Sequence, residues 1–215
     1  MVGLLSDGPA RAPLLEAARS FDHGLERGIE GRTGLPEAVN RPRIALEGLG
    51  MGTALLDILR PREAPRAERI LIDRDARFVA LGVGMAHARL AQERVPAWLG
   101  PWRDQAWNGW GFQRAAMEPH RLRGAVRLGG PRQPDVWIGA GRALWFLYAG
   151  DAAGLVRRLA LADAEPLPYL WQGVGIASAF AGGCTEHAHV VLHDACPDTS
   201  LERGRALGFE AASSP

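Results

Sequence analysis

A glycine-rich motif that recurs along the chain constrains its fold more than any other feature. Residues 170–183 read LWQGVGIASAFAGG, and variants of this motif return about every thirty residues. The first glycine of each copy lies at position 24, 48, 82, 109, 139, 173 or 204, which gives steps of 24, 34, 27, 30, 34 and 31 residues. This spacing is typical of two helices and two turns per copy.

The small residues of each copy predict closely packed helices. Residues four apart lie on one helix face, so a glycine or alanine at each such position lets another backbone approach closely. Glycine inside a helix costs about 1 kcal/mol relative to alanine, and its repetition implies that close packing offsets this cost. Proline residues lie between the copies, where helices end. We therefore expect an all-α fold, a helical repeat array of about seven Gly/Ala-rich helix copies, either open or curled into a compact bundle.

A dinucleotide-binding α/β fold is the main alternative, because Gly-x-Gly also begins the phosphate-binding fingerprint. That fingerprint requires glycine or alanine at its sixth place. Five copies carry other residues at that place, namely Thr53, His87, Arg114, Leu144 and Ser178. The pattern therefore favours helical repeats over a phosphate loop.

Length and charge limit the remaining classes. The 215 residues are enough for one large domain, and we expect a lead-in segment over residues 1–20 and a single α-helical repeat domain over 21–215. A net charge of +1 gives no reason to expect nucleic acid or an anionic membrane as a partner. No apolar run approaches the ~20 residues of a membrane span, and the N-terminus lacks the features of a signal peptide. We expect a cytoplasmic protein.

Polar and aromatic residues occupy equivalent places in several copies. Glu47, Asn108 and Gln172 each precede the first glycine of their copy, and tryptophan precedes two of them. Helix capping is one interpretation, and a ring of side chains around a cavity is the other. A stripe at helical spacing begins at Arg142 and ends at Asp151. The candidate pocket-lining residues are Glu47, Trp107, Asn108, Trp110, Arg142, Trp145, Asp151, Trp171 and Gln172.

The segment CTEHAHVVLHDAC, residues 184–196, has the densest set of potential metal ligands. His189 and His193 are four apart, as ligands on one helix face would be. His187 and His189 point to different faces, however, and the paired cysteine spacing of a structural zinc site is missing. We expect no metal and no cofactor.

Several of the motifs resemble those of a known family. The motifs are EGLGMGTALLD, LGVGMAHARL, WNGWGFQRAAM, GRALWFLYAGD and LWQGVGIASAFAGG, in that order. They resemble a bacterial family of unknown function whose members occur in the conserved gene cassettes of enediyne polyketide biosynthesis and in related natural-product clusters. The resemblance runs from about residue 21 to residue 212. The chain departs from it at His87, where the family more often has a small or apolar residue.

The resemblance implies a role in making a polyketide-type product but supplies no reaction. We expect an accessory protein that binds a polyketide synthase, another protein of the cassette or a hydrophobic polyene intermediate. The alternative is an enzyme that cyclises or rearranges a polyketide chain in an aromatic-lined cavity. An array with an uncapped end would also favour a homodimer.

Overall fold

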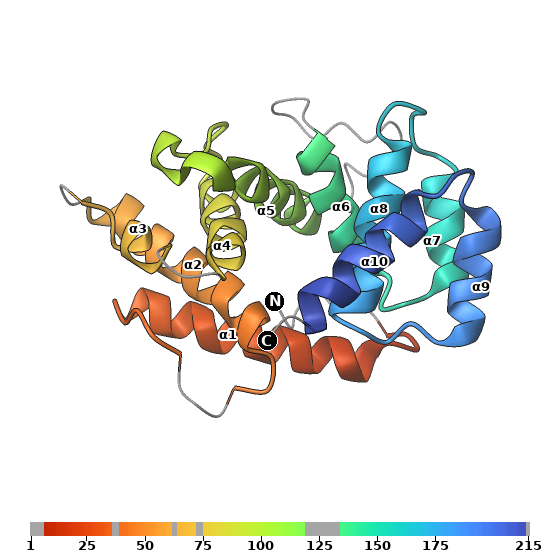
Figure 1. The fold of residues 1–215 in the computed structure, drawn as a ribbon, viewed down its shortest axis with the longest axis horizontal. Helices are drawn as coiled ribbons and strands as arrows, with labels where there is room; N and C mark the ends of the chain where they lie inside the picture. The colour runs from red at the N-terminus through yellow and green to blue at the C-terminus, as the bar shows by residue number, and fades with distance from the viewer. Residues whose placement is uncertain (1–6, 36–38, 62–63, 72–74, 119–133, 214–215) are drawn as a thin grey trace. The chain divides into compact units, whose positions relative to one another are not determined.

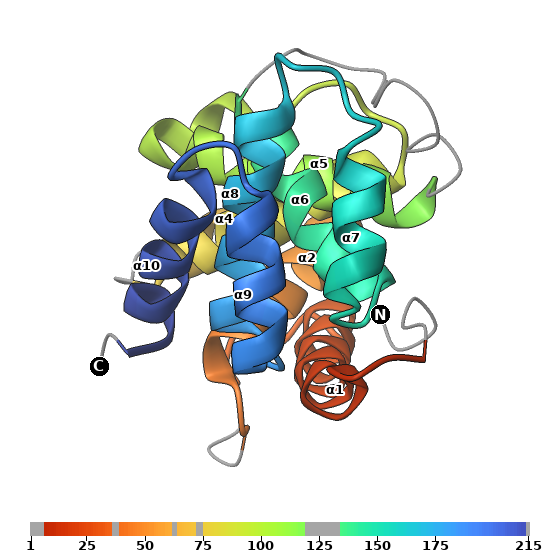
Figure 2. The ribbon, with the colours of Figure 1, turned by 90° about the vertical axis from the view of Figure 1, so that its right-hand side faces the viewer.

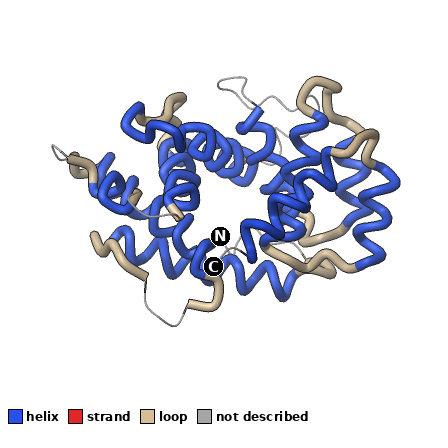
Figure 3. The backbone as a smooth tube through the Cα atoms, in the orientation of Figure 1, coloured by secondary structure: helices blue, strands red, loops and turns tan. Residues whose placement is uncertain are grey.

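The structure is a computed structural model that describes residues 7–35, 39–61, 64–71, 75–118 and 134–213. Within these ranges the regular structure is helical and contains no strand, which confirms the predicted all-α class (Figures 1 and 3). The elements are α1 (Arg11–Ile29), α2 (Pro42–Leu59), α3 (Arg66–Ile70), α4 (Ala76–Arg89), the 3-10 helix η2 (Ala97–Trp102), α5 (Arg103–Met117), α6 (Pro134–Leu147), α7 (Ala152–Leu159), α8 (Leu167–Phe180), α9 (Glu186–Ala195) and α10 (Ser200–Ser213).

The chain divides into two compact units. The first unit comprises Ala17–Trp110, and the second comprises Val2–Glu16 together with Gly111–Pro215. The divisions fall inside α1 and α5, so α1 runs continuously across position 20, the predicted end of the lead-in segment.

Helices of the first unit approach one another through glycines. A Cβ atom at Gly48 would overlap the carbonyl oxygen of Phe21 in α1, and one at Gly50 would overlap that of Val79 in α4. In α4, Gly84 meets the backbone of Ala106 in α5 in the same way. No side chain larger than hydrogen fits at these positions without moving a backbone. The glycines therefore set the distances between α1, α2, α4 and α5.

Helices of the second unit also pack closely at glycines. A Cβ atom at Gly173 of α8 would overlap the carbonyl oxygen of Ile138 in α6, and one at Gly175 would overlap that of Leu201 in α10. Gly111, near the middle of α5, meets Val136 of α6 equally closely. In α2 and α8, the first glycine of the pair faces the preceding glycine-bearing helix, and the second faces the following one.

The seven predicted copies lie on α1, α2, α4, α5, α6, α8 and α10. The other elements occupy the intervals between them. In the second unit, α7 and α9 contact each other (Figure 2). Asp151 caps the N-terminus of α7 and Thr185 caps that of α9, each by accepting a hydrogen bond from a backbone N–H. None of the described helices combines the length and the apolar character that crossing a membrane requires.

Candidate functional site

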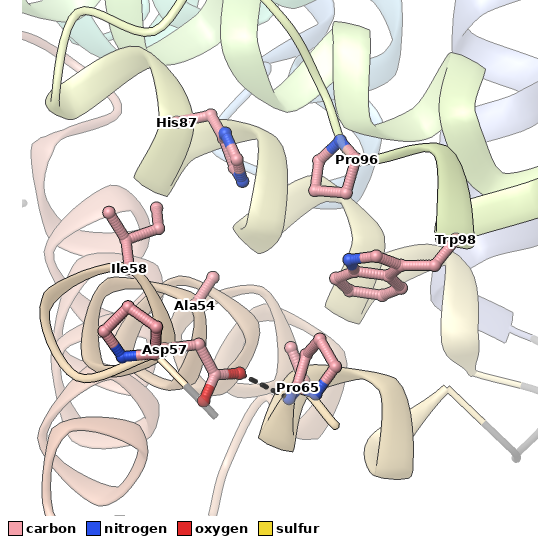
Figure 4. Close-up of a pocket in the computed structure, with 9 residues that line it drawn as sticks. Ala54, Asp57, Ile58, Pro65, His87, Pro96 and Trp98 are labelled. Carbon is pink, nitrogen blue, oxygen red and sulfur yellow. Dashed lines mark hydrogen bonds between the residues drawn. The ribbon is translucent and has the colours of Figure 1, made fainter. Parts of the chain in front are cut away.

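A pocket of about 240 Å³ lies within the first unit and opens to solvent (Figure 4). It is formed where α2, α3, α4 and the start of η2 meet. Alanine, isoleucine, proline and tryptophan make up most of its wall. The lining residues are Ala54, Asp57, Ile58, Pro61, Pro65, Ala67, His87, Pro96 and Trp98.

Prolines shape this pocket because they end helices and fix the backbone beside them. Pro61 follows the last residues of α2, and Pro65 and Pro96 directly precede α3 and η2. Both preceding prolines are extended, with φ of −60°, the angle that the proline ring imposes. The chain therefore turns sharply into two short helices, and η2 brings Trp98 to the pocket opposite α2 (Figure 4).

Asp57 has a structural role at the edge of the pocket. One carboxylate oxygen accepts a 2.7 Å hydrogen bond from the Arg66 guanidinium, and the other accepts a 3.0 Å bond from the backbone N–H of Ala67. The Asp57 and Arg66 side chains are each only 12% exposed. Removing one partner of such a shielded pair leaves the other charge uncompensated. Asp57 thus fixes α3 against α2, and both of its oxygens are engaged.

His87 is the second ionisable residue in the wall of the pocket. Its side chain extends from α4 toward the space that Trp98 also faces (Figure 4). The residue is 9% exposed, and its Nδ1 atom is buried with no hydrogen-bond partner among the described residues. Burial lowers the pKa of the imidazole below its usual value of 6.5, Gln92 opposes that shift through a hydrogen bond, and Arg94 adds to it. The ring is therefore neutral at pH 7.

The backbone also joins Gln92 to His87. The N–H of Gln92 donates a 2.9 Å hydrogen bond to the His87 carbonyl, just after the end of α4.

Four of the nine sequence-predicted pocket residues lie in the first unit. Glu47, Trp107, Asn108 and Trp110 are all buried in α2 or α5, and none of these four lines the pocket. Trp107 and Trp110 pack edge to face with ring centroids 6.0 Å apart. The Trp110 indole donates a 2.8 Å hydrogen bond to the backbone carbonyl of Gln92, so Trp110 helps to position the residue that contacts His87.

The other five predicted residues lie in the second unit. Arg142 is buried with its guanidinium 5.6 Å from the centre of the Phe112 ring. The buried Trp145 donates a hydrogen bond to the carbonyl of Gly182, and Asp151 caps α7. Trp171 is buried, and the backbone carbonyl of Gln172 lies against Gly204 of α10. These observed contacts are packing and capping contacts, and their role in a ligand cavity stays a prediction.

The capping interpretation of the equivalent polar residues is wrong. Glu47, Asn108 and Gln172 lie inside α2, α5 and α8, in the second turn of each helix. N-cap residues lie outside the first turn. The three residues do occupy equivalent positions, because α2, α5 and α8 each begin the same number of residues before the first glycine of their copy.

The cysteine- and histidine-rich segment is divided among separate contacts. His189 shares a 2.7 Å hydrogen bond with Glu202, and Cys184 lies 3.5 Å from the Arg205 guanidinium. Burial raises the pKa of the Cys184 thiol, although Arg205 opposes this. Within the described parts of the chain, no group of three potential ligands is arranged to hold a metal ion.

The residues that line the pocket were not among the predicted site residues. In the sequence, His87 stands out only as the residue at a fingerprint position and as a departure from the family pattern. A signal was present, because this histidine follows a nearly continuous apolar run in α4, where an unpartnered polar group is costly. The prolines at 61, 65 and 96 marked the surrounding loops.

Comparison with known proteins assigns no activity. Residues 131–212 match the model of a family described as a protein of unknown function (DUF1702). This match covers less than half of the chain and lies within the second unit, whereas the pocket lies within the first. No curated protein and no solved structure is similar enough to match the chain.

Proposed function

We propose that this protein is a non-catalytic accessory protein that binds a hydrophobic small molecule in the pocket of the first unit. The observation that carries the proposal is a mostly apolar pocket with one imidazole, that of His87, in its wall. Ligand pockets typically combine a mostly apolar wall with a few placed polar groups. Ala54, Ile58 and Trp98 supply apolar surface here.

The volume limits what the pocket can accommodate. An engineered apolar cavity of about 150 Å³ binds benzene. By that measure a pocket of about 240 Å³ fits roughly ten heavy atoms. That size corresponds to a two-ring aromatic compound or to a segment of a longer chain that extends through the open side. A polyene intermediate bound by one end fits this description.

The pocket supports binding better than the alternative enzymatic function. An enzyme that rearranges a polyketide chain by proton transfer needs a group that gives a proton and one that takes it. Of the nine lining residues, Asp57 has both carboxylate oxygens engaged by Arg66 and Ala67. His87 can serve as one proton-transfer group, but the other lining residues supply no second one.

The glycine contacts support a finer proposal about architecture. We propose that the seven glycine-bearing helices form one helical repeat array, in which each Gly-x-Gly pair joins the preceding copy to the following one. Within the first unit this pattern runs through α1, α2, α4 and α5, and within the second through α5, α6, α8 and α10. The function of such an array is to hold short inserted elements, such as α3 and η2, in fixed positions.

A setting in the biosynthesis of an enediyne or another polyketide-type product rests on the resemblance of the sequence motifs. In that setting the protein acts in the cytoplasm, and a synthase or another cassette protein delivers or receives the bound intermediate. Deletion of the gene in its native cluster, followed by mass spectrometry, tests this part. We expect a hydrophobic intermediate to accumulate, and an unchanged product profile would contradict the proposed setting.

Direct binding tests the pocket itself. Titration of the purified protein with naphthalene, an apolar probe of matching size, should give saturable binding. Ile58→Trp enlarges a side chain that lines the pocket and should weaken this binding at least tenfold. Ile29→Trp makes the same change at an exposed position of α1 and should leave binding unchanged. Equal binding by both variants would place the probe elsewhere.

A further inference from the structure

We infer that Trp98 makes this pocket selective for flat, unsaturated ligands, aromatic or conjugated, over saturated ligands of the same size. This inference rests on the proposed binding function and specifies its ligand class. It starts from the composition of the wall, in which Trp98 supplies the one indole among the nine lining residues. The apolar remainder of the wall consists of alanine, isoleucine and proline, whose side chains are saturated.

A ligand in the pocket can reach Trp98. The residue is partly exposed, and its side chain projects from η2 into the pocket (Figure 4). Ala54 and Ile58 of α2 lie across the pocket from it (Figure 4). A ligand bound there therefore lies between the indole on one side and a saturated wall on the other.

The backbone holds Trp98 in position before a ligand arrives. Val95 and Leu99 are only 5% and 1% exposed, so the chain is anchored in the core on both sides of Trp98. Pro96 has a φ of −60° at the start of η2, and Gly100 has a φ of 52°, which favours glycine. A wall that is already ordered loses little conformational freedom when a ligand binds.

The indole attracts an unsaturated ring more strongly than a saturated one. The face of an aromatic ring is electrically negative and its edge is positive, so two aromatic rings attract each other in offset-stacked or edge-to-face arrangements. Such pairs contribute to binding beyond the area that they bury. A saturated ring gains only the burial of its surface. We therefore expect a preference for the unsaturated ligand of roughly two- to tenfold.

Naphthalene and decalin test the inference in the intact protein, because both consist of two fused rings and only naphthalene is aromatic. The two probes also differ in how readily they leave water. The quantity to measure is therefore the ratio of their dissociation constants in the wild type, compared with the same ratio in Trp98→Leu, since transfer from water cancels in this comparison. We expect the wild type to favour naphthalene roughly two- to tenfold more than Trp98→Leu does.

Two further variants control for indirect effects. Trp98→Phe keeps an aromatic ring and should retain most of the preference. Trp102→Leu makes the same change as Trp98→Leu at the last residue of η2, which does not line the pocket, and should retain all of it. The same ratio in Trp98→Leu as in the wild type would overturn the selectivity while leaving the binding function intact. An equal loss in Trp102→Leu would also overturn it, because the preference would then come from the fold of η2. Failure of both probes to bind would overturn the binding function itself.

Discussion

At the scale of single residues, the neutral state of His87 gives the fold a dependence on pH. Burial lowers the pKa of His87 below 6.5 in the folded protein, whereas the unfolded chain takes up the proton near pH 6.5. Below that pH the unfolded state binds more protons than the folded state. The free energy of unfolding therefore falls as the pH decreases through this window, by at most about 1.4 kcal/mol per pH unit for one group.

Denaturation at pH 7.5 and pH 5.5 measures this effect. The wild-type protein should lose more stability between the two values than His87→Leu does, because leucine has no proton to gain. His193→Leu, at an exposed position, should keep the wild-type slope. The same slope in His87→Leu and in the wild type would show that other groups cause the pH dependence.

At the scale of helices, the glycine pairs imply that both faces of one helix are closely packed. In α8, Gly173 faces α6 and Gly175 faces α10. Alanine at either position would raise helix propensity by about 1 kcal/mol, yet its Cβ would overlap a backbone carbonyl. We expect each substitution to lower the free energy of unfolding by about 1–3 kcal/mol, the usual cost of overpacking.

Chemical denaturation of matched variants tests this packing. Gly34→Ala is the control, because no described heavy atom lies within 4 Å of a Cβ at that position. It should change stability by only a few tenths of a kcal/mol. If Gly173→Ala destabilised the protein and Gly175→Ala did not, α8 would be closely packed on one face alone, and the proposed repeat pattern would fail there.

The glycine-bearing helices could be predicted from sequence because close backbone contacts require glycine, which gives a local sequence pattern. A helix that meets two neighbours at backbone distance requires glycine at fixed positions, and those positions can be read one copy at a time. The short elements α3 and η2 have no such glycine pattern. They are set by prolines and by contacts such as Asp57 with Arg66, which joins residues of separate elements.

The candidate site was harder to predict because its walls follow no local sequence pattern. Its walls come from residues as far apart in sequence as Ala54 and Trp98, and no repeat spacing relates them. The prediction favoured polar and aromatic residues at equivalent places in the copies, and those at Glu47 and Trp107 proved to be buried within helices. A polar residue that interrupts an apolar helix face, as His87 does, was the better guide.

At the scale of the whole molecule, ligand binding in one unit should change the unfolding of the chain in a defined way. A ligand that binds only the folded state stabilises it by about 2.7 kcal/mol at a free concentration about 100 times Kd. For a chain of this size each kcal/mol raises Tm by roughly 2–4 °C. We therefore expect naphthalene to raise the Tm by roughly 5–11 °C where the whole chain unfolds in one transition.

Calorimetry with and without the probe measures this shift. The ligand should raise the Tm of every transition in which the first unit unfolds. A transition in which only the second unit unfolds should keep its Tm. Ile58→Trp should show a smaller shift at the same naphthalene concentration, because its affinity is lower, whereas Ile29→Trp should show the full shift. A probe that raised the Tm of a second-unit transition alone would bind outside the pocket formed by Ile58, His87 and Trp98. The ligand site would then have to be sought among the helices that bear Arg142 and Trp171.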